Sequence, residues 1–148
     1  MTTITIIKES NIFNSKCQTL VNTVNCVGVM GKGIALEMKN RYPTMFEKYK
    51  ELCDKKLIDI GKLWLYKDFN GAWFLNFPTK KHWKMNSQYE YIEDGMRKFV
   101  ETYKDKGITS IAFPMLGCNN GKLNKDIVLE IMTKHFIKCD NLIVEIYY

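Results

Sequence analysis

The stretch that decides the fold runs from residue 19 to residue 43 and reads TLVNTVNCVGVMGKGIALEMKNRYP. Its first part, Thr19–Asn25, is rich in β-branched and apolar residues, which is typical of a buried strand. Glycines follow at positions 28, 31 and 33, and then Ile34, Ala35 and Met38 have the spacing of one helix face. The stretch therefore predicts a strand, a glycine-rich loop and a helix in direct succession.

Strands and helices alternate along the rest of the chain as well. We expect further strands at residues 3–8, 62–67, 72–77, 109–114 and 142–147. Further helices are expected over residues 44–54, between Ser87 and Gly107, and over residues 124–137. Ser87 and Glu90 have the spacing of a capping box at the start of the second of these helices. The alternation predicts one domain over residues 1–148, a layered α/β fold with helices on both faces of a mostly parallel sheet.

The composition excludes several classes of protein. The chain has 148 residues, of which 46% are hydrophobic, too many for a disordered chain. No apolar run approaches the roughly 20 residues that cross a bilayer, and the first ten residues lack a signal-peptide pattern. We therefore expect a cytoplasmic protein without a membrane partner, and a monomer is the default for a domain of this size. The formal net charge of +6 is compatible with an anionic partner.

The cysteines and histidines predict neither a disulfide framework nor a metal site. The chain has five cysteines and two histidines. No cysteine pair has C-x-x-C spacing, and the histidines lie far apart in the sequence. Cys26 and Cys118, which fall in the two loops described next, are expected to act as small residues rather than nucleophiles.

Two loops have a composition that suits phosphate groups. Residues 26–34 (CVGVMGKGI) lead into a helix N-terminus, where free N–H groups and the helix dipole favour an anion. Their G-x-x-G-x-G spacing matches neither the P-loop nor the dinucleotide fingerprint, so a simple strand-to-helix turn is an equal alternative. Residues 116–121 (LGCNNG) form a second such loop. Two of them in one small α/β domain favour a diphosphate or nucleotide held from both sides.

Asn22 and Asn25 lie at the end of the first apolar strand, where an amide either stabilises a turn or contacts a ligand. A further polar segment, NFPTKKHWK at residues 76–84, combines three lysines with His82 and Trp83. It is either a solvated basic loop or a surface on which Trp83 stacks a base while the cations follow a phosphate backbone. A lysine crowded by other cations is also a better nucleophile, because its ammonium form is disfavoured.

Together these stretches resemble the macrodomain family, which has a three-layer α/β/α fold with a mixed, mostly parallel central sheet and binds ADP-ribose. Residues 19–43, residues 76–84 and PMLGCNNGKL at residues 114–123 resemble the DarG-type branch in particular. That branch consists of DNA ADP-ribosyl glycohydrolases, antitoxins that remove ADP-ribose from thymidine in single-stranded DNA. The resemblance implies ADP-ribose and ADP-ribosylated single-stranded DNA as ligands, a DNA-modifying ADP-ribosyltransferase toxin as a further partner, and no cofactor or metal.

The resemblance also implies roles for individual residues, with Lys80 and Asn22 as the catalytic pair. ADP-ribose is expected to contact Asn11, Ile12, Asn22, Asn25, Gly28, Val29, Met30, Gly31, Lys32, Gly33, Ile34, Leu116, Gly117, Cys118, Asn119, Asn120 and Gly121. DNA is expected to contact Lys81, His82, Trp83 and Lys84. Two positions depart from the wider family, because Asn11 stands where an aspartate commonly reads the adenine amino group. Gly121 stands where the animal relative has an acidic residue that assists turnover.

The role of Lys80 and the leaving group both have alternatives at this point. As a neutral amine, Lys80 would attack the opened ribose aldehyde and form a Schiff base. As an ammonium, it would position or protonate groups on the leaving side. The chain is also compatible with hydrolysis of a protein ester, an O-acyl-ADP-ribose or ADP-ribose 1″-phosphate, and with a non-catalytic ADP-ribose-binding module. Nucleic-acid binding without ADP-ribose would leave both glycine loops without a role.

Overall fold

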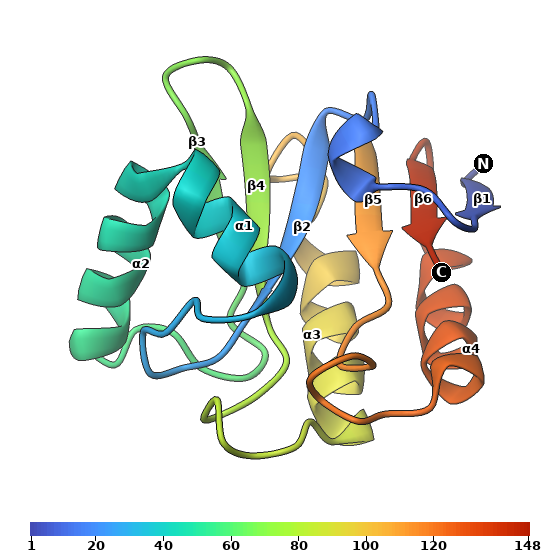
Figure 1. The fold of residues 1–148 in the computed structure, drawn as a ribbon. Coiled ribbons are helices and arrows are strands. Elements are labelled where there is room, and N and C mark those ends of the chain that lie inside the picture. Colours follow the sequence, from blue (N-terminus) through green and yellow to red (C-terminus); the bar gives the residue numbers. More distant parts are fainter.

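The computed structural model describes residues 1–148 and contains one six-stranded sheet (Figure 1). The strands are β1 (Thr3–Ile7), β2 (Thr19–Val24), β3 (Trp64–Lys67), β4 (Trp73–Pro78), β5 (Ser110–Pro114) and β6 (Ile143–Tyr147). Their order across the sheet is β1-β6-β5-β2-β4-β3, and β3 alone runs antiparallel to its neighbour. The predicted mixed, mostly parallel sheet is confirmed.

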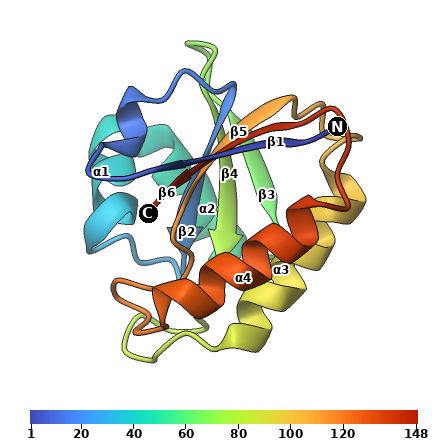
Figure 2. The same cartoon turned by 90° about the vertical axis from the view of Figure 1, so that its right-hand side faces the viewer.

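Helices cover both faces of this sheet and complete the three layers. α1 (Gly33–Arg41) and α2 (Pro43–Asp54) lie on one face, and α3 (Tyr89–Thr102) and α4 (Lys125–Phe136) lie on the other (Figures 1 and 2). A short 3-10 helix, η1 (Ile12–Asn14), follows β1. None of the helices has both the length and the apolar character needed to span a bilayer.

The largest part of the core lies between the sheet and the layer of α3 and α4. Rings from four elements meet there edge to face, with Phe113 of β5 at 5.1 Å from Phe136 of α4 and 5.4 Å from Phe99 of α3. Phe77 of β4 joins this cluster, and Gly95 of α3 lies directly against its ring. A Cβ atom on Gly95 would overlap the ring, so the close approach of α3 to β4 requires glycine at this position.

The start of α3 differs from the predicted capping box. The helix begins at Tyr89 after Gln88, and no side chain caps it. The backbone N–H of Ser87 donates to the carbonyl oxygen of Gly121 at 3.0 Å, which ties this segment to the loop after β5. The serine therefore joins two loops rather than capping the helix.

The carboxyl ends of β2, β4 and β5 lie side by side along one edge of the sheet, the lower edge in Figure 1. The glycine-rich residues 26–33, the basic residues 79–88 and the loop at residues 115–124 all leave the sheet at this edge. In open α/β sheets this is where ligands bind. The fold thus brings together the three stretches that the sequence singles out.

The contact between α3 and β4 predicts an unusual response to a helix-favouring substitution. Gly95→Ala should lower the free energy of unfolding by about 1–3 kcal/mol, because the added methyl group meets the Phe77 ring. At an uncrowded helical glycine the same change raises stability by about 1 kcal/mol. Urea unfolding of Gly95→Ala, Phe77→Leu and the double variant measures the effect. The double variant should lose less than the sum of the two single losses, and a stabilised Gly95→Ala would contradict the packing described here.

Candidate functional site

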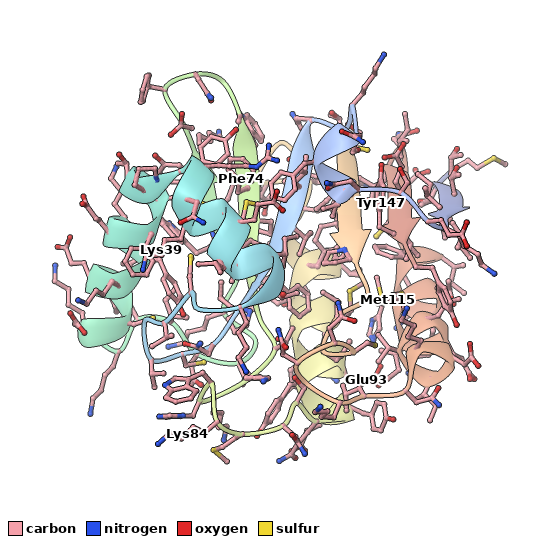
Figure 3. The ribbon with its side chains drawn as sticks, in the orientation of Figure 1. Lys39, Phe74, Lys84, Glu93, Met115 and Tyr147 are labelled. Carbon is pink, nitrogen blue, oxygen red and sulfur yellow. The ribbon has the colours of Figure 1, made fainter.

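A cavity of about 520 Å³ lies beyond the carboxyl ends of the strands. From the residues expected to bind ADP-ribose or DNA, its lining contains Asn11, Ile12, Asn25, Val29, residues 31–34, Lys80, Trp83 and residues 117–121. The two glycine loops, the end of β4 and the connection from β1 to η1 thus share one space. Figure 3 labels the lining residues Tyr147 and Met115 on the right-hand side of the molecule and Lys84 of the basic segment at the lower left.

Asn25 organises the first glycine loop from inside. Its side-chain oxygen accepts from the backbone N–H of Val27 at 3.0 Å, and its amide nitrogen donates to the carbonyl of Val29 at 2.7 Å. The buried hydroxyl of Tyr49 lies 2.7 Å from the Asn25 carbonyl oxygen and 2.8 Å from its side-chain oxygen. Asn25 lines the cavity, yet its polar atoms are engaged in the loop, so it acts chiefly as a turn-stabilising residue.

The first turn of α1 offers an anion site on the cavity wall. Gly33, Ile34 and Ala35 line the cavity, and their N–H groups precede the first intrahelical hydrogen bond. Neither a side-chain cap nor an acidic residue occupies this turn. Unpaired N–H groups and the positive end of the helix dipole together stabilise a bound phosphate group.

The second glycine loop closes the opposite wall and has no room for side chains at its glycines. A Cβ atom on Gly121 would overlap the Ser87 hydroxyl and the Gly117 carbonyl oxygen. Gly117 has a φ of +72°, which favours glycine. A Cβ on Gly33 would lie 3.2 Å from the side-chain nitrogen of Asn120, so the two glycine loops approach each other here. An acidic residue at position 121 is therefore incompatible with this loop.

Lys80 is held at the junction of β2 and β4. The N–H of Thr79 donates to the carbonyl of Val24 at 2.9 Å, and the N–H of Cys26 donates to the carbonyl of Lys81 at 3.4 Å. These bonds continue the pairing of the two strands past their ends and fix the backbone on both sides of Lys80, whose side chain lines the cavity. Partial burial and the like charges of Lys32 and Lys122 lower the pKa of the Lys80 ammonium.

Outside the cavity, the basic segment forms an aromatic and cationic surface next to Lys80. Trp83 is 47% exposed, and the Lys84 ammonium lies 5.0 Å from its ring centroid. The His82 ring lies 5.5 Å from the Trp83 ring, and its Nδ1 accepts from the Lys84 N–H at 3.1 Å. Trp83 also lines the cavity, so its ring connects the cavity with the outer surface. Lys81, His82 and Lys84 lie outside the lining.

Asn11, Ile12 and Tyr147 line the cavity near the ends of β1 and β6, which are separated from β4 and the following Lys80 by β5 and β2. The Asn11 side-chain oxygen accepts from the N–H of Phe13 at 2.9 Å, which caps η1. This bond fixes the orientation of the amide, since the oxygen must face the N–H donor. The side-chain oxygen expected to accept from adenine is thus already partly used by the protein.

The two cysteines of the loops have the character of small, protonated residues. Burial raises the pKa of Cys26 to about 12 and that of Cys118 to about 11. A thiol becomes a nucleophile as its thiolate, which these shifts disfavour near neutral pH.

Asn22, which is expected to be catalytic and to contact ADP-ribose, is fully buried and does not line the cavity. Asn22 is the register partner of Asn76 across β2 and β4, and its amide nitrogen donates to the Asn76 side-chain oxygen at 3.0 Å. Asn76 in turn donates to the carbonyl of Trp64 at 3.3 Å. The side-chain oxygen of Asn22 has no hydrogen-bond partner, so only this atom of the side chain remains available to a ligand, and the roles expected for Asn22 stay predictions.

Three other residues expected to bind ADP-ribose also lie outside the lining. Met30 and Leu116 belong to the hydrophobic core, with exposures of 1% and 0%. Gly28 faces away from the cavity toward Lys50 and Cys53 of α2. Conversely, the sequence analysis missed the lining residues Ser10, Thr23, Val24, Ala35, Thr79, Pro114, Met115 and Tyr147. Most of these stand at or just after strand ends, so the rule that ligands bind at carboxyl ends would have found them.

Comparison with known proteins agrees with this geometry. The Macro domain family model matches residues 21–132. The macrodomain of Thermus aquaticus DarG has 32% sequence identity and a TM-score of 0.93, and the match covers 100% of this chain and 99% of that one. Thermosipho africanus DarTG, solved in complex with ADP-ribose, has 40% identity and a TM-score of 0.91 over 98% of this chain and 41% of that one.

A relative from the same organism is the DNA ADP-ribosyl transferase-DNA ADP-ribosyl glycohydrolase fusion protein of Thermosipho africanus. It is 41% identical over 157 residues, which cover 94% of this chain and 40% of that protein. The chain spans about 40% of the length of the curated relatives that it matches first. The family match over residues 21–132 and the likeness to the DarG macrodomain along the whole chain show that this protein belongs to the macrodomain family.

Proposed function

We propose that this chain is an ADP-ribosyl glycohydrolase that removes ADP-ribose from thymidine bases of single-stranded DNA. The observation that carries the proposal is the position of Lys80, at one end of a cavity whose walls suit a diphosphate and beside an exposed basic and aromatic surface. The DNA ADP-ribosyl glycohydrolase part of the fusion protein named above supports the same activity. Its transferase part supports a DNA-modifying ADP-ribosyltransferase toxin as a partner of this chain.

The lining of the cavity favours one orientation of bound ADP-ribose. The diphosphate fits between the first turn of α1 and the loop at residues 117–121, where unpaired N–H groups face it. The distal ribose then points toward Lys80, and the adenosine occupies the end lined by Asn11, Ile12 and Tyr147. Binding energy from the diphosphate, remote from the reacting bond, serves to hold the ribose in position for reaction.

Lys80 fits the role of an amine nucleophile better than that of an acid. Burial and two neighbouring cations favour its neutral form. The Nζ lone pair attacks C1″ of the distal ribose, the C1″–N bond to the base breaks, and the proton lost by Nζ passes to the base. The resulting amine adduct opens to an imine, and one water molecule then releases ADP-ribose and restores the amine. The net reaction is hydrolysis of the C1″–N bond.

The second glycine loop supports a reaction without an acidic residue at position 121. A carboxylate side chain there would require displacement of Ser87 and of the Gly117 backbone. The chain therefore differs in this respect from the mechanism of the animal relative. The lysine carries the covalent step, and the loop supplies shape and backbone N–H groups.

Removal of the amine provides the first test of this proposal. Lys80→Ala should reduce release of ADP-ribose from an ADP-ribosylated single-stranded oligomer by about 10²–10⁴-fold, since a positioned reacting group is lost. Calorimetry should show that free ADP-ribose still binds within about threefold, because its diphosphate is held elsewhere. Sodium borohydride should trap an adduct on the natural chain and not on Lys80→Ala. Equal release rates for both proteins would contradict the proposal, and release by neither would identify a binding module.

The lowered pKa of Lys80 predicts the direction of the pH dependence. The neutral amine accumulates as pH rises through the lowered pKa, so kcat/KM should increase with pH. It should level off below 10.5, the ordinary lysine value. The measurement is the initial rate of ADP-ribose release from the oligomer between pH 6 and pH 10, within the range where the protein stays folded. A rate that falls over this range would show instead that the ammonium is the active form.

Trp83 should distinguish DNA from small ADP-ribose conjugates. Trp83→Ala should weaken binding of the ADP-ribosylated oligomer by about 1–3 kcal/mol, the usual contribution of one stacked base. Binding of free ADP-ribose should change much less. Phe69→Ala is the matched control, because Phe69 is 96% exposed in the turn between β3 and β4 at the opposite end of the sheet. Equal losses for oligomer and ADP-ribose would favour a small conjugate as substrate.

A further inference from the structure

Three lysines from separate loops converge at the mouth of the cavity. Lys32 immediately precedes α1, Lys80 follows β4, and Lys122 follows Gly121 of the second glycine loop. Lys32 and Lys80 line the cavity, and Lys32 and Lys122 are the two cations that act on the Lys80 ammonium. A Cβ atom on Gly33 would lie 3.2 Å from the Asn120 side-chain nitrogen, so the two loops that carry Lys32 and Lys122 approach each other.

No carboxylate balances these charges. The ion pairs of the protein involve other residues, and none includes Lys32, Lys80 or Lys122. Like charges that share one site repel each other, and this repulsion is relieved when an anion binds between them. The three lysines therefore favour a ligand that brings negative charge to the mouth of the cavity.

The backbone at Lys122 has a conformation that glycine and asparagine adopt more easily than lysine does. Its φ is +69°, in the left-handed region that side chains other than glycine and asparagine rarely occupy. The residue is exposed and makes no hydrogen bond or ion pair through its side chain. Packing gives no reason for a lysine here, whereas its ammonium at the mouth of the cavity does.

We propose that Lys32 and Lys122 bind a backbone phosphate of the DNA strand next to the modified nucleotide and so place its base in front of Lys80. The inference rests on the proposed function and adds a subsite to it. The diphosphate of ADP-ribose already has the N–H groups of α1 and of the second loop. Lys122 directly follows Gly121, whose carbonyl oxygen accepts from the Ser87 N–H at 3.0 Å, so it lies beside the end of the basic segment. A phosphodiester next to the modified base would reach this side of the second loop.

The test removes the charge of Lys122 and keeps most of its volume. Lys122→Met should raise KM for the ADP-ribosylated oligomer roughly threefold to tenfold near physiological salt. Because Lys122 also lowers the pKa of Lys80, kcat of the two proteins is compared at the high-pH plateau, where it should agree within about twofold. The slope of log KM against log salt should decrease by about 0.7, the value for one phosphate contact on a single strand. Calorimetry with free ADP-ribose should give the same affinity for both proteins within about twofold.

Two further variants isolate the charge from the backbone. Lys122→Arg keeps a cation at this position and should keep KM within about twofold of the natural chain. Lys56→Met is the matched control, because Lys56 is also an exposed lysine with a positive φ, of 57°, but lies beyond the end of α2. An unchanged KM and salt slope for Lys122→Met would overturn the inference. An equal loss of ADP-ribose affinity would also overturn it, because the lysines would then bind the diphosphate.

Binding of an unmodified single-stranded oligomer separates this inference from the proposed function. If the chain releases no ADP-ribose but Lys122→Met still weakens oligomer binding and lowers its salt slope, the glycohydrolase proposal fails and the phosphate subsite stands. If release proceeds and Lys122→Met changes neither oligomer measurement, the subsite fails alone.

Discussion

The pairing of β2 with β4 is the constraint on which the site depends. The two parallel strands come from stretches more than fifty residues apart, and their pairing continues past the sheet through Val24, Thr79, Cys26 and Lys81. This continuation brings the start of the glycine-rich loop against the end of the basic segment. The glycine-rich loop and Lys80 therefore lie together, and the Cys26 thiol of that loop donates to the Lys80 carbonyl oxygen at 3.4 Å.

Close backbone approach is the second constraint, and glycines provide it on two sides of the same segment. Gly95 lets α3 pack directly on Phe77, just before the chain reaches Lys80. Gly121 lets the second loop settle onto Ser87, just after the chain leaves the basic surface. The segment that carries Lys80 is thus anchored at both ends by contacts that a single methyl group would disturb. Rigid support of this kind is what a reaction that depends on position requires.

The sequence predicted the sheet and the layers, because hydrophobic periodicity reports them directly, and the glycine spacing predicted the two loops that share one cavity. The sequence did not predict in which direction individual side chains of these stretches point. The polar amide of Asn22 at the end of an apolar strand suggested a ligand contact, but the strand directs its amide nitrogen toward Asn76. Met30 and Leu116 fall within the two glycine loops that line the cavity, and yet their side chains pack into the core. Tyr147 was missed because its closeness to the cavity depends on strand order, which periodicity does not report.

The buried pair formed by Asn22 and Asn76 has a consequence for folding fidelity. The hydrogen bond from the Asn22 amide nitrogen to the Asn76 side-chain oxygen forms only when these two residues are register partners, and a slip of one residue would leave both buried amides without it. Most of the neighbouring side chains on these strands are apolar and would accept several alignments. The pair therefore favours a single register of β2 and β4. A sheet shifted by one residue would turn the side chains that follow β4, including Lys80, to the opposite face.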